Sequence, residues 1–494
     1  MVRAALAALI LLGSSPAWAD APLIEAAKSG DDAAAFTLID RGTDVNVRAA
    51  DGATALQWAA YRDDVDLANR LIKAGADVKL VNNYGATAMS VAATTANVEM
   101  LKLLLDAGAD VESPNADGQT ALMIVARTDR IDAAALLLKR GAKVNATEKW
   151  RGQSALIWAA AECQPEMVRL LASHGADLDA HSMVNDWKRH NSAEPREQHR
   201  PTGGFTPLLY AAREGCLDAA SELVRAGADI NLPNPDGITP LLMATLNARW
   251  DLAGYLLSAG ADPNRWDVWG RTPLYSTVDY NTIPVGGRPD RPSMDKTTAL
   301  DLIEMLLKAG ANPDMQLKVL PPFRDLRQDR AGDRMLTVGT TPLIRAAKSG
   351  DAAAIKLLLA YKADPNLPNS LGITPLMSAA GIGSWRLDNR GVYRNEPDGI
   401  ASAKLLVDAG ADLSASDENG QTVLFGAAQW GWNDMVTYLV QKGANVMAVD
   451  AKGFNLVDAA LGKAGGPVRF GIAPDVHEDT ARLIEALIAK NAGL

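Results

Sequence analysis

The segment Asp51-Gly-Ala-Thr-Ala-Leu-Gln-Trp-Ala-Ala60 decides the fold, because the chain repeats it at a regular interval. It returns as Tyr84-Gly-Ala-Thr-Ala-Met-Ser-Val-Ala-Ala93 and, in shorter form, as Asp236-Gly-Ile-Thr-Pro-Leu241. A fixed period of this length predicts a stack of similar helical units. The second-position glycines recur every 33 or 34 residues, except at three places, and they are Gly52, Gly85, Gly118, Gly152, Gly204, Gly237, Gly270, Gly339, Gly372, Gly420 and Gly453.

Each repeat carries residues that begin and end a helix. Thr54 and its equivalents stand where a side-chain oxygen caps the first free amides of a helix. Prolines follow this threonine where a missing N–H costs nothing, at Pro207, Pro240, Pro273, Pro342 and Pro375. Each repeat closes on a turn such as Ala74-Gly-Ala-Asp-Val78, whose glycine ends the second helix. We interpret the periodic aspartates of these turns (Asp77, Asp110 and Asp177) as structural turn residues.

These residues resemble the ankyrin-repeat family, whose pattern is Gly-x-Thr-Pro-Leu-His-x-Ala-Ala followed by Leu-Leu and Gly-Ala-Asp. The resemblance covers nearly all of the chain after residue 19 and implies an all-α repeat solenoid. Its helix-turn-helix units are expected to be joined by β-hairpin or turn connections, with about twelve units in one curved stack over residues 20–494. The family's usual histidine is replaced by Gln57, Ser90, Met123 or Ile157, which weakens one hydrogen bond of the pattern.

Residues 1–19 have the pattern of an export signal. Arg3 supplies a positive charge, Ala4 to Leu12 is an apolar run, and Ala17-Trp-Ala19 matches a cleavage site. The apolar run is too short to span a bilayer, which argues against the alternative of a membrane anchor. The sequence therefore predicts cleavage after Ala19 and export, with the periplasm as the first location and the extracellular space as the second.

Charge and motifs limit the function. The formal net charge of −10 argues against a general nucleic-acid binder and against adhesion to anionic lipid. The glycine-rich stretch from Gly465 to Gly471 lacks the lysine of a phosphate-binding loop, and no G-x-S-x-G motif is present. We therefore predict that the protein is not an enzyme and needs no cofactor.

Five segments interrupt the period and add residues to single repeats. They are predicted near residues 184–202, 281–297, 320–336, 384–398 and 462–477. Long loops are often functional, although a tolerated surface insertion is the alternative. His181, His190 and His199 surround the first of them and are weak candidates for metal ligands. Their spacing matches no established ligand pattern, so a solvated polar loop is the favoured interpretation.

Cys163 and Cys216 are the two cysteines of the chain. Both are predicted in turns between the helices of consecutive repeats, and export makes oxidation possible. Packed helices lie about 8–10 Å apart, whereas a disulfide needs Cα atoms within about 7 Å. Two separate thiols are therefore favoured over a bridge.

The residues predicted to contact a partner are aromatic and arginine side chains at variable repeat positions. The resemblance implies that partners dock on the hairpin-and-concave surface, and Trp, Tyr and Arg dominate interface energetics. The candidates are Tyr61, Arg62, Tyr84, Arg127, Trp150, Phe205, Arg213, Trp266, Trp269, Tyr280 and Trp430. The strongest contact is expected at the hairpin from Asn264 to Trp269, which carries two tryptophans. The alternative is that these rings pack against adjacent hairpins.

The favoured hypothesis is a monomeric scaffold that binds a protein partner in the periplasm, without contact to nucleic acid or insertion into a membrane. Two alternatives belong to other classes. One is an exported effector that acts on the proteins of a host. The other is a metal-dependent or enzymatic activity built from the insertions.

Overall fold

The computed structural model describes residues 22–186, 202–282, 294–319, 337–382, 395–464 and 475–491. It forms two compact units, Met1–Asp177 (unit 1) and Leu178–Leu494 (unit 2). The described ranges contain 24 α-helices and no β-strand. No helix in these ranges is long and apolar enough to cross a membrane. The predicted export signal lies outside the described residues, as do most residues of the five predicted insertions.

Unit 1 contains ten of these helices. They are α1 (Pro22–Ser29), α2 (Asp32–Asp40), α3 (Ala55–Arg62), α4 (Val65–Lys73), α5 (Ala88–Thr95), α6 (Val98–Asp106), α7 (Ala121–Val125), α8 (Ile131–Lys139), α9 (Ala155–Ala161) and α10 (Pro165–Ser173).

Unit 2 contains the other fourteen. They are α11 (Pro207–Glu214), α12 (Leu217–Ala226), α13 (Pro240–Leu246), α14 (Trp250–Ser258), α15 (Pro273–Asn281), α16 (Ala299–Lys308), α17 (Pro342–Ser349), α18 (Ala352–Ala360), α19 (Pro375–Ala380), α20 (Glu396–Asp408), α21 (Val423–Trp430), α22 (Asn433–Gln441), α23 (Leu456–Ala460) and α24 (Glu478–Asn491).

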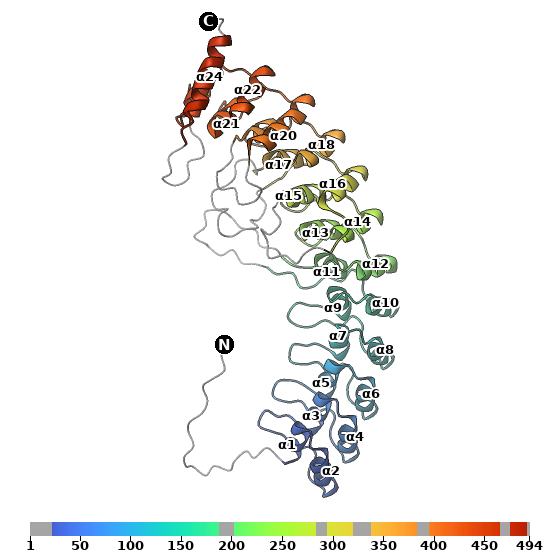
Figure 1. Ribbon diagram of the computed structural model, residues 1–494. Helices are drawn as coiled ribbons and strands as arrows, with labels where there is room; N and C mark the ends of the chain where they lie inside the picture. The colour runs from blue at the N-terminus through green and yellow to red at the C-terminus, as the bar shows by residue number, and fades with distance from the viewer. Residues whose placement is uncertain are drawn as a thin grey trace, which may run out of the picture. The chain divides into compact units, whose positions relative to one another are not determined.

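Within each unit, consecutive helices pack as pairs, and the pairs stack. In unit 1 the odd-numbered first helices, α1 to α9, form one row, and the even-numbered second helices form the other (Figure 1). Loops project from the first-helix side, on the left of Figure 1. Unit 2 repeats this arrangement from α11 to α24. The predicted all-α repeat solenoid is confirmed, whereas the count of twelve repeats and the single continuous stack stay predictions.

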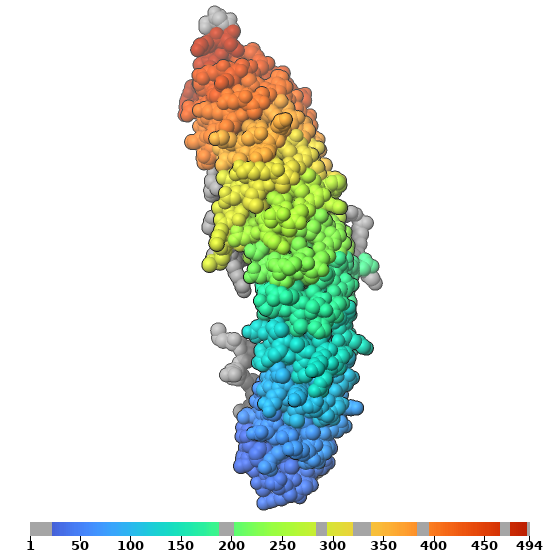
Figure 2. All heavy atoms as spheres, turned by 90° about the vertical axis from the view of Figure 1, so that its right-hand side faces the viewer, coloured from blue at the N-terminus to red at the C-terminus, as the bar shows by residue number. Residues whose placement is uncertain are grey.

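Small and large apolar residues divide the packing between the two rows. Ala59 and Ala60 of α3 are fully buried, and so are Leu67 and Leu71 of α4. Alanine lets the first helices approach closely, while leucine fills the wider space between second helices. Figure 2 views the molecule from the side on which the second helices lie in Figure 1, with the beginning of unit 1 in blue. Since one repeat covers only part of its apolar surface, stability depends on the contacts between neighbours.

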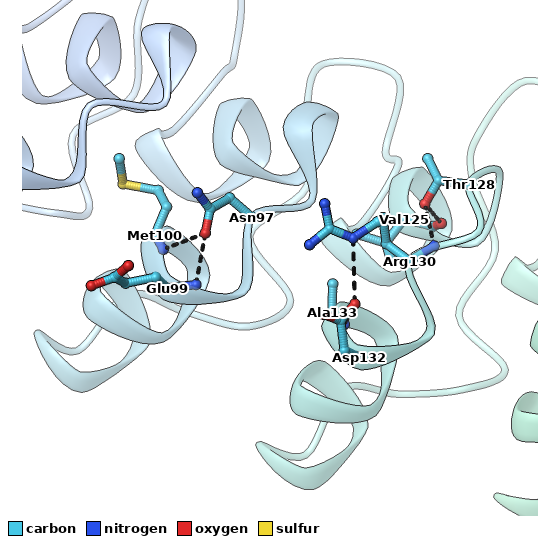
Figure 3. Close-up of polar contacts among 8 residues, drawn as sticks. All are labelled: Asn97, Glu99, Met100, Val125, Thr128, Arg130, Asp132 and Ala133. Atoms are coloured by element: carbon cyan, nitrogen blue, oxygen red, sulfur yellow. Dashed lines mark hydrogen bonds and ion pairs between the residues drawn. The ribbon is translucent and has the colours of Figure 1, made fainter.

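The predicted helix starts are present in the structure. The Thr54 side chain accepts a hydrogen bond from the Gln57 amide, and the Gln57 side chain accepts one from the Thr54 amide. The second helices are capped less uniformly, as two turns in unit 1 show (Figure 3). Asn97 Oδ1 caps α6 by accepting from the amides of Glu99 and Met100, whereas Arg130 precedes α8 without a side-chain cap.

Where the structure describes the connections between repeats, they are turns rather than paired strands. Isolated antiparallel bridges occur in four of them, such as Thr147 with Ser154. Gln57, which stands where the family has its usual histidine, bonds to the next repeat. This buried side chain donates to the carbonyl oxygens of Leu80 and Ala86 in the next connection, at 3.0 and 2.9 Å. An amide with two N–H donors therefore replaces the missing ring.

A second set of inter-repeat bonds joins the closing turns. Asn46 donates from Nδ2 to the Gly75 oxygen and accepts from the Asp77 amide, at 3.0 and 2.8 Å. Asn145 makes the same two bonds to Gly175 and Asp177. We call each of these asparagines an amide clip; in unit 2 the amide clips are Asn264 and Asn366. The side chain of Asp77 accepts from the Lys79 amide, which confirms its interpretation as a turn residue.

Candidate functional site

The first helices of unit 1 present one face to solvent at two positions. Counted from the capping residue, position 4 is half-buried and position 7 is more exposed. Position 4 holds Trp58, Val91, Ile124 and Trp158, and position 7 holds Tyr61, Thr94, Arg127 and Ala161. The equivalent positions in α1 hold Glu25 and Lys28. We call this surface the first-helix face of unit 1.

Cations lie over aromatic rings on this face. The Lys28 Nζ lies 5.6 Å from the centre of the Trp58 ring, and the Arg127 Cζ lies 4.6 Å from that of Trp158. Each contact joins position 7 of one repeat to position 4 of the next. Such a contact stabilises an exposed site by about 0.5–1 kcal/mol. Sequence reasoning missed Lys28, Trp58 and Trp158, although the register of the repeat places them in these two rows.

The predicted candidates of α3 extend this face. Tyr61 is 64% exposed, and its ring meets Trp58 edge-on at 5.7 Å between centroids. Arg62 is also exposed. The neighbouring edge-to-face contact holds the Tyr61 ring in one orientation while leaving most of its surface to solvent.

Two aromatic side chains stand at the tips of connections in unit 1. Tyr84 is 71% exposed and Trp150 is 73% exposed. The Trp150 Nε1 donates to Asp117 Oδ1 of the preceding connection at 3.0 Å. This bond fixes the indole while its ring faces remain uncovered. An aromatic ring that is held in place and exposed is suited to anchor a partner, since little conformational entropy is lost when it binds.

The candidates at the start of unit 2 pack on one another. Phe205 is half-buried and meets Tyr210 edge-on at 5.5 Å between ring centroids. The Arg213 guanidinium lies 4.9 Å from the Tyr210 ring centre and also contacts Glu214 at 2.7 Å. These residues form a local cluster in which much of each ring is already covered.

The prediction of two exposed tryptophans at residues 264–269 is wrong for one of them. Trp266 is 45% exposed, with Lys318 Nζ 4.0 Å from its ring centre. Trp269 is only 3% exposed and lies under the Arg271 guanidinium, at 4.7 Å. Its carbonyl oxygen also accepts from the Lys318 amide at 2.9 Å. Trp269 therefore stabilises the connection and is not an accessible anchor.

A buried ion pair underlies this connection. The Arg271 Nε donates to Asp267 Oδ2 at 2.7 Å, and both side chains are buried. Asp267 Oδ1 accepts from the amides of Trp269 and Arg271. Burial raises the pKa of Asp267 above its ordinary value, and the pairing with Arg271 offsets this only in part. The group has a structural role, because its hydrogen-bond partners all belong to its own turn.

The remaining aromatic candidates pack against neighbouring helices. Tyr280 is half-buried and meets Trp250 edge-on at 5.2 Å between ring centroids. Trp430 is half-buried as well, and its Nε1 donates to the Gly381 oxygen at 3.1 Å. Both rings follow the alternative interpretation, in which they fill space between repeats.

Position 4 of the first helices has a different character further along unit 2. Ser276 of α15, Arg345 of α17 and Ser378 of α19 are all fully buried. Asp279, at position 7 of α15, binds the Arg345 Nε at 2.6 Å. This contact joins the same two positions as the cation–ring contacts of unit 1, but here it is a largely buried ion pair. Sequence reasoning missed it, because the two residues are separated by 66 positions.

No group of three metal-ligating side chains is found where the structure describes the chain. His181 lies within this part, whereas His190 and His199 lie outside it. The weak prediction of a metal site at these histidines therefore stays untested.

The expectation of two separate thiols is wrong. Cys163 and Cys216 are both disulfide-bonded, and neither is free. The expectation rested on the distance between helix axes. Cys163 lies in a turn with a positive φ of 58°, and Cys216 is the residue before α12. Turn residues are not held at the spacing of helix axes, so that distance does not exclude a bridge.

Comparison with protein families identifies the repeat. A model for three consecutive ankyrin repeats matches residues 23–115, 99–182, 180–267, 208–285 and 294–384, and a single-repeat model matches residues 419–451. Together these matches cover well over half of the chain.

Similar proteins share the repeat over short stretches. The chain is 35% identical to the ankyrin repeat domain-containing protein OPG015 of monkeypox virus over 72 residues, which are 15% of this chain and 16% of that protein. It is 34% identical to the neurogenic locus notch homolog protein 1 of Xenopus tropicalis over 131 residues, 25% of this chain and 5% of that protein. The chain thus spans a small part of the length of either relative.

Among solved structures, the human ASB11 ankyrin repeat domain is similar with a TM-score of 0.41 and 23% identity, covering 49% of this chain and 99% of that one. The ankyrin repeat domain of Bcl-3 has a TM-score of 0.38 and 30% identity, covering 46% and 94%.

Proposed function

Because this chain belongs to the ankyrin-repeat family, whose repeats bind protein partners, we propose that it is a scaffold that binds a protein through unit 1. The binding surface consists of the first-helix face of unit 1 and the tips that carry Tyr84 and Trp150. The observation that carries this proposal is the exposure of Tyr61, Tyr84 and Trp150, each more than three-fifths open to solvent. Exposed aromatic side chains contribute little to folding and much to binding.

Unit 1 is preferred over unit 2 for this role because its rings are open. The unit 2 candidates Phe205, Trp269, Tyr280 and Trp430 are half-buried or buried against their neighbours. Trp266 is the exception and is a secondary contact in this proposal.

The pattern of residues 1–19 supports an action in the periplasm, and the extracellular space is the second choice. In this proposal the chain acts as a monomer and contributes binding rather than catalysis.

The test is capture of a partner from a periplasmic extract by the purified chain. The triple variant Tyr61→Ser, Tyr84→Ser, Trp150→Ser is expected to lose capture while its melting temperature stays within a few degrees of the wild type. The matched control is Met447→Ser with Val449→Ser, which removes exposed apolar residues from a connection of unit 2. Equal capture by the triple variant would show that the surface lies elsewhere.

A further inference from the structure

We infer that the partner of unit 1 is an acidic segment of protein in which carboxylates alternate with apolar side chains. This inference rests on the function proposed above and adds the chemistry of the partner. It follows from the distribution of charge on unit 1 and from the way its cations are held.

Exposed cations gather on the proposed binding surface. Lys28 and Arg62 lie on first helices, Arg127 lies two residues after the end of α7, and Arg48, Lys149 and Arg151 lie in the connections. The carboxylates of the same surface are Glu25, Asp51, Asp117 and Glu162, together with the buried Glu148. One of them, Asp117, already accepts from the Trp150 indole. Cations therefore outnumber carboxylates here, although the whole chain has a net charge of −10.

The opposite edge of unit 1 has the opposite character. The turns between first and second helices carry five carboxylates, Asp31, Asp63, Asp64, Asp129 and Glu162, and two arginines, Arg127 and Arg130, and Asp32 and Asp132 follow at the start of the second helices. Arg130 itself contacts Asp132 at 3.4 Å (Figure 3). An acidic partner is thus repelled by one edge of unit 1 and attracted to the other. Such an asymmetry orients a partner before contact and suppresses the reverse arrangement.

Two of the cations lie over aromatic rings and make only long contacts with carboxylates of the same unit. The Arg127 Cζ lies over the Trp158 ring, and a guanidinium beside an aromatic ring keeps N–H donors for a carboxylate. Arg127 is 3.4 Å from Glu162, a distance that is long for a charged hydrogen bond and leaves room for a closer carboxylate. Lys28 makes a comparable pair with Trp58 and a long contact with Glu25, at 3.7 Å. Each pair offers a charge beside an apolar ring.

The spacing of the two pairs sets the length of the partner segment. Neighbouring helices lie about 8–10 Å apart, so the three intervals from α3 to α9 span about 30 Å. An extended chain covers this distance in about nine residues. A segment of about twelve residues therefore reaches both ring–cation pairs, whereas one of five or six residues reaches only one.

The probe is a random library of twelve-residue peptides, selected on the full chain at low ionic strength. The selected peptides are expected to be rich in Asp and Glu and to contain aromatic or aliphatic residues. Binding of one of them, measured by fluorescence polarisation, should weaken at least tenfold in Lys28→Glu with Arg127→Glu. The matched control is Lys102→Glu with Lys139→Glu, which makes the same charge change on exposed sites of α6 and α8 and should bind as the wild type does.

Three outcomes would contradict the inference in different ways. Basic or uncharged peptides that need Trp58 and Trp158 would overturn the acidic partner and leave the proposed surface intact. Peptides that bind both charge-reversed variants equally and do not need the two tryptophans would overturn the surface as well. Competition by a twelve-nucleotide thymidine strand would show that the cations and rings serve a nucleic acid instead.

Discussion

The same inter-repeat contact has different chemistry in the two units. In unit 1, position 7 of a first helix places Lys28 or Arg127 over a half-exposed tryptophan of the next repeat. In unit 2, one contact between these positions is the largely buried pair of Asp279 with Arg345. An exposed contact contributes little to stability and remains available to a partner, whereas a buried pair fixes neighbouring helices and is closed to solvent. In the proposed function, these positions thus serve binding at two repeats of unit 1, whereas they serve structure at one repeat of unit 2.

The largest effect is expected from Asp279→Ala. It removes the carboxylate that Arg345 binds, and we expect the free energy of unfolding to fall by about 3 kcal/mol. Urea unfolding of the full chain measures this.

The matched change in unit 1 is Arg127→Gln, which should cost less than about 1 kcal/mol. If Asp279→Ala and Arg127→Gln lowered the free energy of unfolding equally, the two contacts would not differ in their contribution to stability. The double change Asp279→Leu with Arg345→Leu should be less destabilising than Asp279→Ala, because no buried charge then remains at this contact.

A smaller loss is expected from Gly381→Ala, at position 7 of α19. Gly381 has a φ of +99°, and an added Cβ would lie 2.6 Å from Cδ1 of Trp430. Strain and displacement of the ring should together cost about 2 kcal/mol. Thr94→Ala tests the same position of α5 in unit 1 and should change stability by less than about 0.5 kcal/mol. Thermal unfolding of both variants is sufficient, and a neutral Gly381→Ala would mean that Trp430 moves without cost.

Asp267→Asn gives this connection of unit 2 the residue that stands at the same place, as Asn82, in one connection of unit 1. Asn82 Oδ1 accepts from the amides of Tyr84 and Ala86, just as Asp267 does from its turn. Because the pKa of Asp267 is raised above 3.8, the folded chain holds this proton more tightly than the unfolded chain. The contribution of Asp267 to the free energy of unfolding therefore falls as the pH rises through the pKa that this group has in the folded chain.

The variant lacks this titration. Its stability relative to the wild type should rise between pH 4 and pH 7, as measured by urea unfolding at both values. A relative stability that falls with pH would mean that Arg271 holds the carboxylate more strongly than burial opposes it.

The smallest effect is expected from Trp150→Ala. The side chain is largely exposed and makes one hydrogen bond, to an exposed carboxylate, so the melting temperature should change by no more than about two degrees. Partner capture should nevertheless fall. A large drop in melting temperature would show that Trp150 supports unit 1 rather than serving a partner.

The sequence predicts the backbone of this protein better than the exposure of its side chains. The threonine caps, the prolines and the closing glycines each follow from local chemistry, and the structure has them where the period places them. Tyr84 and Trp269 precede equivalent glycines, yet only Tyr84 is exposed. The difference arises from their neighbours, because Arg271 stacks on Trp269 where unit 1 has the small Ala86.

The ring–cation pairs show the same limit. Lys28 and Trp58 belong to different repeats, and nothing local to either residue marks the other. They are found by aligning consecutive repeats and comparing position 7 with the following position 4. Asp279 and Arg345 of unit 2 are paired by the same comparison only after the two added segments between them are set aside.

The amide clips hold neighbouring closing turns at the same hydrogen-bond distance, whatever the number of residues between those turns. Asn46 and Asn145 reach a glycine 29 or 30 residues ahead, whereas Asn264 and Asn366 reach one 46 or 44 residues ahead. The donor–acceptor distances are nevertheless nearly the same, at 2.9 Å for Asn264 and 3.0 Å for the other three. For protein engineering, we therefore expect that residues 283–293 and 383–394 can be exchanged without changing the bonds that the clips make. A loop, tag or sensor module exchanged there should leave both flanking repeats in register, since the clips bind backbone atoms that no inserted residue supplies.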